Sequence, residues 1–284
     1  MPHSYGWIKD KPDERDFIYH AGQDVKEPLP KTPIGYFFEW LVNLFHPKPK
    51  PQPSDNKKVD LRSDDSPIED QGQLGSCTAN ALAGALQFLE VKDSLPDQAF
   101  SRLFVYYNER VIEGTTSSDS GAEIRDGIKT LASQGSCYET TWPYDINQFA
   151  VQPPQAAYVE ASNHEIVQYF KITSLADMKA CLDAGYPFVY GFTVYASFES
   201  PSADSTGIIP MPSGLEPVLG GHAVMCLGYD DEKQWFICRN SWGTGWGDHG
   251  YFYIPFDYLA DAQLASDFWT IRRGTNMVAK PSTA

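Results

Sequence analysis

Several residues in this chain have the types and spacing needed for cysteine-based acyl chemistry. Cys77 ends the stretch Gln71-Gly72-Gln73-Leu74-Gly75-Ser76-Cys77, directly before a long apolar run. His222 and Asn240 lie far downstream, on either side of a short acidic turn. A nucleophilic thiol needs a base that accepts its proton, and the base needs a third group that fixes its tautomer. Cysteine, histidine and asparagine supply these three groups in this chain.

The elements that must position these residues are one helix and two strands. The run Thr78–Glu90 is apolar on nearly every face, which predicts a buried helix with Cys77 at its start. The N–H groups and the dipole at a helix start favour a thiolate. Residues 221–229 and 234–240 have the pattern of two strands joined by a tight turn. We therefore expect the histidine and the asparagine to lie close together on antiparallel neighbours.

Each feature alone also has an ordinary structural explanation. A cysteine before an apolar helix can simply cap a core element, and a histidine at a strand end is usually a surface group or a satisfied one. The combination of all three residue types, with their flanking sequences, favours chemistry over these explanations.

Both segments resemble motifs of the papain-like cysteine peptidases. Gln-Gly-x-x-Gly-Ser-Cys at 71–77 matches one family pattern, and His-Ala-Val at 222–224 with Asn-Ser-Trp-Gly-Thr-Gly-Trp-Gly at 240–247 matches the other. In such enzymes the histidine and asparagine follow the cysteine by roughly 130–150 residues, a spacing that the histidine fits and the asparagine slightly exceeds. The resemblance covers most of residues 58–275 and indicates a divergent member of bacterial type.

The resemblance implies a role for each of these residues. Cys77 is expected to be the nucleophile, His222 the general acid and base, and Asn240 the group that orients the histidine. Gln71 is expected to donate its side-chain amide to the oxyanion, beside the backbone N–H of the nucleophile. Trp242 is expected to shield the histidine–asparagine hydrogen bond and to border the bound substrate.

The resemblance also places the substrate. Gly121 and its neighbour Ser120 lie in a loop whose backbone is expected to pair with an extended peptide, because glycine allows a close approach. Gly221, directly before the histidine, belongs to the second side-chain pocket, where it offers no charge and leaves room for a bulky apolar side chain. The loops 200–206 and 210–217 are long enough to reshape the cleft.

Two residues depart from the family pattern. Leu74 stands where the family has a disulfide-bonded cysteine, so apolar packing is expected to hold this wall of the cleft. Thr78 replaces an aromatic residue after the nucleophile and can still form a hydrogen bond in the first helical turn. Neither change affects a proton-transfer group.

The five cysteines do not form an obvious disulfide framework. If the turn between the two strands places Tyr229 opposite Trp235, Cys226 lies opposite Cys238. Directly opposed Cβ atoms are about 4.5–5.5 Å apart, which is long for a bridge and favours two buried thiols over a disulfide. The remaining cysteines have no evident partners.

The predicted fold class is α+β. The resemblance implies a two-lobed papain-like fold with a mainly helical left lobe, an antiparallel β-barrel-like right lobe and the active-site cleft between them. Helices are expected at 100–110 and 122–134, and further strands at 187–194, 207–209 and 251–254.

The chain is expected to divide into residues 1–58 and a peptidase domain at 59–284. By position the first part fits an inhibitory pro-segment, although it lacks the family's long helical one; a permanent accessory element is the alternative. Its aromatic run Phe37–Phe45 is expected to dock on the peptidase domain, and Lys48–Lys50 to lie in a cleavable Pro-rich linker. No signal peptide is visible, and the mature enzyme is expected to be secreted or extracytoplasmic.

Composition narrows the classes of function. The net charge of −15 argues against nucleic acid as a partner. No run of 18 apolar residues marks a membrane span. We expect a monomeric endopeptidase that acts on a peptide or protein substrate, without metal or cofactor. The alternatives are a papain-fold amidase, deamidase, transferase or exopeptidase, and a catalytically silent binding module, which would usually have lost the cysteine or the histidine.

Overall fold

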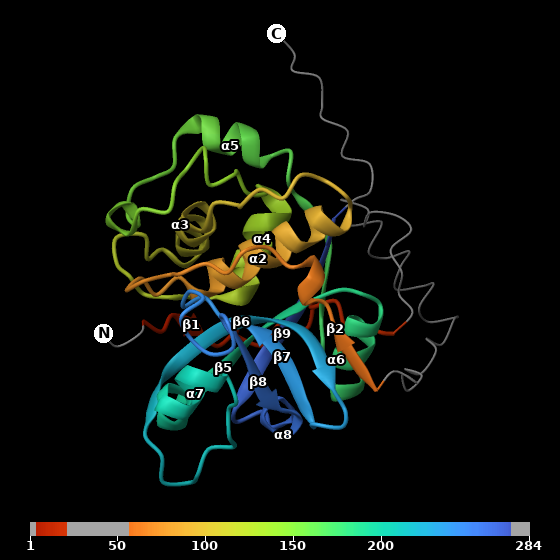
Figure 1. The fold of residues 1–284 in the computed structure, drawn as a ribbon. Helices are drawn as coiled ribbons and strands as arrows, with labels where there is room; N and C mark the ends of the chain where they lie inside the picture. The colour runs from red at the N-terminus through yellow and green to blue at the C-terminus, as the bar shows by residue number, and fades with distance from the viewer. Residues whose placement is uncertain (1–3, 22–56, 274–284) are drawn as a thin grey trace.

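Helices gather on one side of the molecule and most strands on the other (Figure 1). The structure, a computed structural model, describes residues 4–21 and 57–273. The helical side contains α2 (Cys77–Lys92), α3 (Arg102–Glu113), α4 (Ile124–Ser133) and α5 (Gln155–Ala161). Near the strands lie α6 (Leu175–Asp183), α7 (Pro201–Thr206) and α8 (Phe256–Ala260), and short 3-10 turns cover Arg62–Asp64, Ile146–Gln148 and Ala196–Glu199.

The strands form a seven-stranded sheet in the order β4-β9-β5-β6-β7-β8, with β2 paired to β6. Their bounds are β2 Lys58–Asp60, β4 Ile166–Lys171, β5 Phe188–Tyr195, β6 Val218–Asp230, β7 Trp235–Arg239, β8 Tyr251–Pro255 and β9 Ala265–Arg273. All these pairings are antiparallel. The α+β prediction, with a helical and an antiparallel lobe, is confirmed.

Helix α2 is the central element of the helical side. Every residue from Cys77 to Glu90 is buried, as the all-round apolar pattern predicted. It packs against β6 of the sheet and against α3 and α4. This contact joins the two sides of the molecule along α2. Within the described ranges no helix is long and apolar enough to cross a membrane.

Two local predictions differ from the structure at their boundaries. The helix expected from residue 122 begins at Ile124, because Ala122–Glu123 forms the short strand β3. The segment 200–206, taken as a loop, contains α7. Its sequence holds the signals of a short helix: the Ser200 hydroxyl accepts from the backbone N–H of Ala203, proline occupies the first turn, and Gly207 ends the helix in a left-handed conformation.

The hairpin of β6 and β7 has a different register from the predicted one near its turn. Tyr229 pairs with Phe236 and not with Trp235. A bulge between Cys226 and Gly228 shifts the register by one residue, so Cys226 still pairs with Cys238, as predicted. Both cysteines are free, which confirms two buried thiols.

The first described residues run between the two sides of the molecule (red in Figure 1). Strand β1 (Trp7–Ile8) pairs in parallel with β3. Further along, the backbone groups of residues 17 and 19 bond to Lys171 at the end of β4. The predicted docking run Phe37–Phe45 and the linker at 48–50 lie outside the described residues.

Candidate active site

Cys77 is the first residue of α2 and is fully buried. Helix geometry leaves N–H groups free at this end. Burial raises the pKa of the Cys77 thiol to about 12, and the backbone N–H groups of Ala223 and Gly6, which reach the sulfur, hold this rise down. The contact with Ala223 places the thiol beside β6, next to His222. With the cleft in this state the thiol is therefore protonated at neutral pH.

His222 and Asn240 form the hydrogen bond that the two-strand hairpin predicted. Nε2 of His222 lies 2.9 Å from Oδ1 of Asn240, and both side chains are buried. The same Oδ1 accepts from the backbone N–H of Ser241 at 2.8 Å, which fixes the orientation of the amide. Because Oδ1 can only accept, Nε2 is the donor and Nδ1 is the basic nitrogen of the neutral ring. This tautomer suits a base whose Nδ1 takes a proton from a thiol.

Aromatic side chains enclose this hydrogen bond. The Trp242 ring stacks on the His222 ring at 5.0 Å between centroids, and Phe192 and Phe198 approach the same imidazole edge-on. The Trp242 side chain is 5% exposed. A low-dielectric surround strengthens the hydrogen bond by excluding water, which is the shielding expected of Trp242.

Gln71 is held at the junction of the two sides. Its Oε1 accepts from the Ser241 hydroxyl at 2.6 Å, and its backbone N–H donates to the Ser241 carbonyl at 2.8 Å. This leaves Nε2 as a donor, and it reaches the Leu74 carbonyl at 2.9 Å and the Ser4 carbonyl at 3.2 Å. Gln71 therefore already donates to a backbone carbonyl of residue 4, which belongs to the N-terminal segment of the same protein.

The loop before Cys77 is held by a carboxylate that the sequence reasoning missed. Leu74 packs in the core, as expected of a position without a disulfide. In addition, the backbone N–H of Gly75 lies 3.0 and 3.1 Å from the two oxygens of Asp119. The Tyr106 hydroxyl donates to the same carboxylate and accepts from the N–H of Gly121 at 3.1 Å. Asp119 thus links the nucleophile loop to the Gly121 loop.

Thr78 forms a hydrogen bond in the first turn of α2, as predicted. Its hydroxyl donates to Oε2 of Glu109 on α3 at 2.9 Å. Glu109 is fully buried, and burial raises the pKa of its carboxyl well above the usual value. Burial therefore disfavours a negative charge at Glu109, a charge that would raise the pKa of the nearby thiol further.

The two predicted substrate-binding glycines lie against backbone atoms of residues 6 and 7, whereas Ser120 forms its hydrogen bonds within its own loop. Gly121 has φ +73°, and a Cβ there would lie 2.1 Å from the Gly6 carbonyl oxygen. A Cβ on Gly221 would lie 2.6 Å from the carbonyl oxygen of Trp7. The Ser120 hydroxyl instead bonds to Thr115 and to the Gly121 carbonyl within its own loop.

Residues 4–10 of the protein occupy the cleft between the helical and the sheet side, and we call them the cleft segment. The Gly6 carbonyl accepts from the N–H of Ala122 at 2.8 Å, and a Cβ on Gly6 would lie 1.8 Å from the Gly75 carbonyl oxygen. The Tyr5 ring meets those of His222 and Trp242 edge-on, each at 6.2 Å. The Tyr5 hydroxyl donates to Glu199. The cleft segment thus covers both sides of the site.

Beyond the cleft, ion pairs and hydrogen bonds anchor the same segment. Asp10 accepts from the Trp269 indole at 2.9 Å and from the backbone N–H of Arg125 at 3.2 Å. Arg125 pairs with Asp16 at 2.6 Å. Burial, and then the nearby charge of Asp267, raise the pKa of Asp10 to about 7. The anchor therefore contains a carboxyl whose charge changes near neutral pH.

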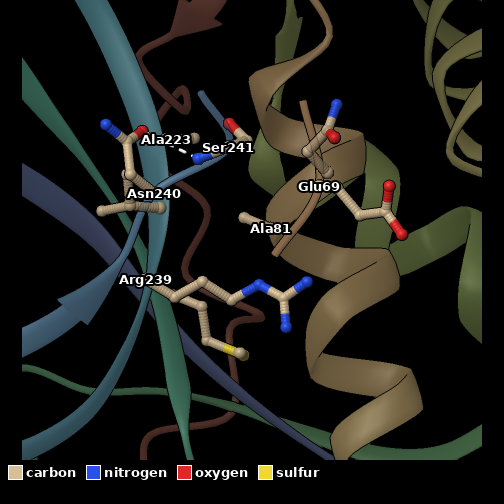
Figure 2. A pocket seen from close by; sticks show the side chains of 9 residues that line it. Glu69, Ala81, Ala223, Arg239, Asn240 and Ser241 are labelled. Carbon is tan, nitrogen blue, oxygen red and sulfur yellow. Dashed lines mark hydrogen bonds between the residues drawn. The ribbon is translucent and has the colours of Figure 1, made fainter. Parts of the chain in front are cut away.

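Behind the site, a small cavity of about 10 Å³ lies between α2 and the sheet (Figure 2). Glu69, Ala81, Ala223, Arg239, Asn240 and Ser241 are among the residues that line it. Its volume allows one water at most, so it is not a substrate pocket. Arg239 extends from the sheet side toward α2 and bonds to Asp65 at 2.7 Å and to Ser66 and Pro67.

Comparison with known proteins agrees with this geometry. The sequence profile of the papain family cysteine proteases matches residues 55–268. An uncharacterized peptidase C1-like protein of Acanthamoeba polyphaga mimivirus is 42% identical over 97% of this chain and 88% of its own length. Digestive cysteine proteinase 2 of Homarus americanus is 29% identical over 74% of this chain and 64% of its own length.

Solved structures show the same fold. Xylellain, a cysteine protease from Xylella fastidiosa, superposes with a TM-score of 0.79 at 39% identity, covering 96% of this chain and 97% of that one. Digestive procathepsin L 3 of Tenebrio molitor shares the fold at 19% identity, with a TM-score of 0.61 and coverage of 89% and 75%. The profile match, the 42% identity and the two-lobed architecture together show that this chain belongs to the papain family of cysteine proteases.

Proposed function

We propose that this chain is a cysteine endopeptidase whose nucleophile is Cys77 and whose cleft is closed by its own N-terminal segment. The observation that carries the catalytic assignment is the buried hydrogen bond of 2.9 Å between His222 Nε2 and Asn240 Oδ1. The N–H of Ala223, the residue after this histidine, reaches the sulfur of Cys77 at the start of α2. In this arrangement each of the three residue types has a separate task.

The reaction follows from these positions. His222 takes the proton of the Cys77 thiol through Nδ1, and the thiolate attacks the substrate carbonyl carbon. Gln71 Nε2 and the backbone N–H of Cys77 donate to the oxyanion that develops. The imidazolium then gives its proton to the leaving amine, and water hydrolyses the thioester by the same steps. The Asn240 oxygen keeps the imidazole oriented throughout.

The cleft segment supports an inhibitory role for the N-terminal region. It is the Gly6 N–H that contacts the Cys77 sulfur, while the Gly6 carbonyl is bonded to Ala122. An amide nitrogen cannot be attacked by a thiolate, so the group of the segment that meets the sulfur is not a cleavable carbonyl. Residues 1–58 therefore act as a pro-segment, and 59–284 as the peptidase domain. A pro-segment of this kind fits release outside the cytoplasm.

Hydrolysis and labelling test the proposal together. The full chain is incubated with internally quenched peptides while its N-terminus is followed by mass spectrometry. We expect peptide cleavage to rise as the cleft segment is lost, and Cys77→Ala to abolish both cleavage and labelling by a thiol-reactive epoxide. Cys137→Ala, which removes another buried thiol, is the matched control and keeps both.

The other outcomes separate the alternatives. Labelling of Cys77 without cleavage of any peptide would favour an amidase, deamidase or transferase. Neither labelling nor cleavage would favour a binding module. Full peptidase activity from a chain that keeps residues 4–10 would overturn the pro-segment and leave the peptidase.

A further inference from the structure

The Trp7 indole fills a pocket whose base is a buried carboxylate. Trp7 Nε1 donates to Oδ2 of Asp267 at 3.1 Å. A Cβ on Gly191 would lie 2.0 Å from the indole ring, and a Cβ on Gly221 would lie 2.8 Å from it. The two glycines therefore make the space that this large side chain fills. We call this space the Trp7 pocket.

A β-bulge aims Asp267 at this pocket. Between the paired residues Val189–Trp269 and Gly191–Ser266, strand β9 has one residue more than β5. Asp267 lies in this bulge with φ +57°, a left-handed conformation that is uncommon outside glycine. Bulges of this type redirect a side chain, often next to an active site. With the cleft segment in place Asp267 is 4% exposed, and its carboxylate accepts from Trp7 and from the backbone N–H of Asp10.

Both donors belong to the cleft segment. When the segment leaves, the Asp267 carboxylate loses them and stands at the base of an emptied pocket. Water replaces these donors in the emptied pocket, and a bound substrate displaces that water. A substrate side chain that supplies N–H groups keeps the carboxylate paired, whereas one without donors leaves it unpaired at a cost in binding energy.

Building on the peptidase function proposed above, we propose that the Trp7 pocket selects substrates with a long side chain ending in N–H donors, arginine foremost and tryptophan next. The residue concerned is the one that lies against Gly221, which is the second on the amino side of the cleaved bond. Arginine is favoured because its guanidinium can bond both carboxylate oxygens. This differs from a purely apolar pocket, which Gly221 alone suggested.

The charges around Asp267 act in two directions. With the segment in place, burial raises the pKa of the Asp267 carboxyl, while Lys171 and Lys9 favour its ionised form. Both lysines also repel a cationic side chain, but Lys9 leaves with the segment. Asp10, whose negative charge disfavours ionisation nearby, leaves as well. The net charge of −15 over the whole chain attracts cationic peptides. After the segment has left, Lys171 is the remaining charge that repels a cationic side chain among those named, while Asp267 and the acidic surface attract it.

Peptides that differ only at the second residue before the cleaved bond test the assignment. The enzyme is the full chain carrying Gly6→Val and Trp7→Ala. The side chain at position 6 collides with the Gly75 carbonyl and drives residues 4–10, with Asp10, out of the cleft. We expect kcat/KM for the arginine peptide to exceed that for the leucine peptide at least about tenfold, the worth of a charge-assisted hydrogen bond. Asp267→Asn, which tolerates the left-handed backbone, should remove this preference and leave the leucine peptide within about twofold.

Two further variants complete the design. Gly191→Val narrows the pocket from its other wall and should lower cleavage of arginine and tryptophan peptides more than that of alanine peptides, without touching the carboxylate. Asp257→Asn, an exposed acid on α8, should change nothing. A leucine preference that neither Asp267→Asn nor Gly191→Val alters would overturn the proposal. Labelling of Cys77 without cleavage of any peptide would instead overturn the peptidase function on which it rests.

Discussion

The two walls of the cleft are held in different ways. On the sheet side, His222 and Asn240 lie on neighbouring strands, and stacked aromatic rings enclose their hydrogen bond. On the helical side, the loop before Cys77 depends on the carboxylate of Asp119 and on the Leu74 side chain. One wall is a continuous ladder with a packed core, and the other is a loop without a ladder that is held by separate hydrogen bonds, many of them from side chains. Damage to the first should therefore lower stability, and damage to the second should lower activity.

The largest expected effect comes from Arg239 on the sheet side. Arg239→Met leaves Asp65 buried without its charged partner, which should lower the free energy of unfolding by about 3–5 kcal/mol. Because the β6–β7 ladder remains, kcat of the folded fraction should stay within about threefold of the parent value. Urea denaturation and active-site titration measure the two quantities. Arg15→Met, which breaks an exposed pair with Asp13, should leave both unchanged.

Asp119 should show the opposite pattern. Asp119→Ala removes the acceptor of the Gly75 N–H and the Tyr106 hydroxyl, at a cost of about 1–3 kcal/mol. A displaced nucleophile loop should lower kcat by up to about 100-fold while KM changes little. Asp119→Asn, which keeps one acceptor oxygen, should lie between the two, and Asp204→Ala on the surface of α7 should match the parent. A loss of stability without a loss of kcat would contradict the contrast between the walls.

The cleft segment contacts both walls, and pH should control its docking. The pKa of Asp10 is raised to about 7 in the docked state, so docking is most stable where Asp10 is protonated and weakens as pH rises from about 4 to about 7. Exchange of the Ala122 amide, which bonds to Gly6, should therefore speed up between pH 4 and 7 beyond its intrinsic pH dependence. Asp10→Asn should flatten this dependence. An equally steep profile in that variant would assign the effect to another group.

Reducing agent should have the smallest effect. All five cysteines are free, so neither wall contains a disulfide. Dithiothreitol should leave the thermal midpoint unchanged, while it keeps Cys77 reactive. A fall in the midpoint on reduction would show that a covalent link stabilises one of the walls.

The sheet-side wall could be predicted because its residues are close in sequence. A hairpin of known turn length places His222 near Asn240, and a bulge shifted the register near the turn without separating them. The helix after Cys77 was equally evident from its apolar run. Short-range patterns and a family motif were sufficient for these elements.

The remaining features depend on contacts between distant segments. Asp119 lies in a polar loop with no sign that it reaches Gly75. Asp267 acts through a bulge, and a single strand sequence does not reveal which residue leaves the ladder. The docking of Tyr5, Gly6 and Trp7 carries no periodic signal, because the segment forms only a two-residue strand.

The way in which Gly6 lies over the thiol, between two large side chains, also gives a design for synthetic inhibitors. At that point the walls leave room for backbone only, whereas the flanking positions hold a phenol beside the imidazole and an indole above a carboxylate. A small molecule that copies this order needs a flat, unsubstituted centre between two large arms, one of them tipped with an N–H group. A compound branched at its centre would be excluded by the same walls. The protein's own N-terminus thus supplies a three-point pharmacophore.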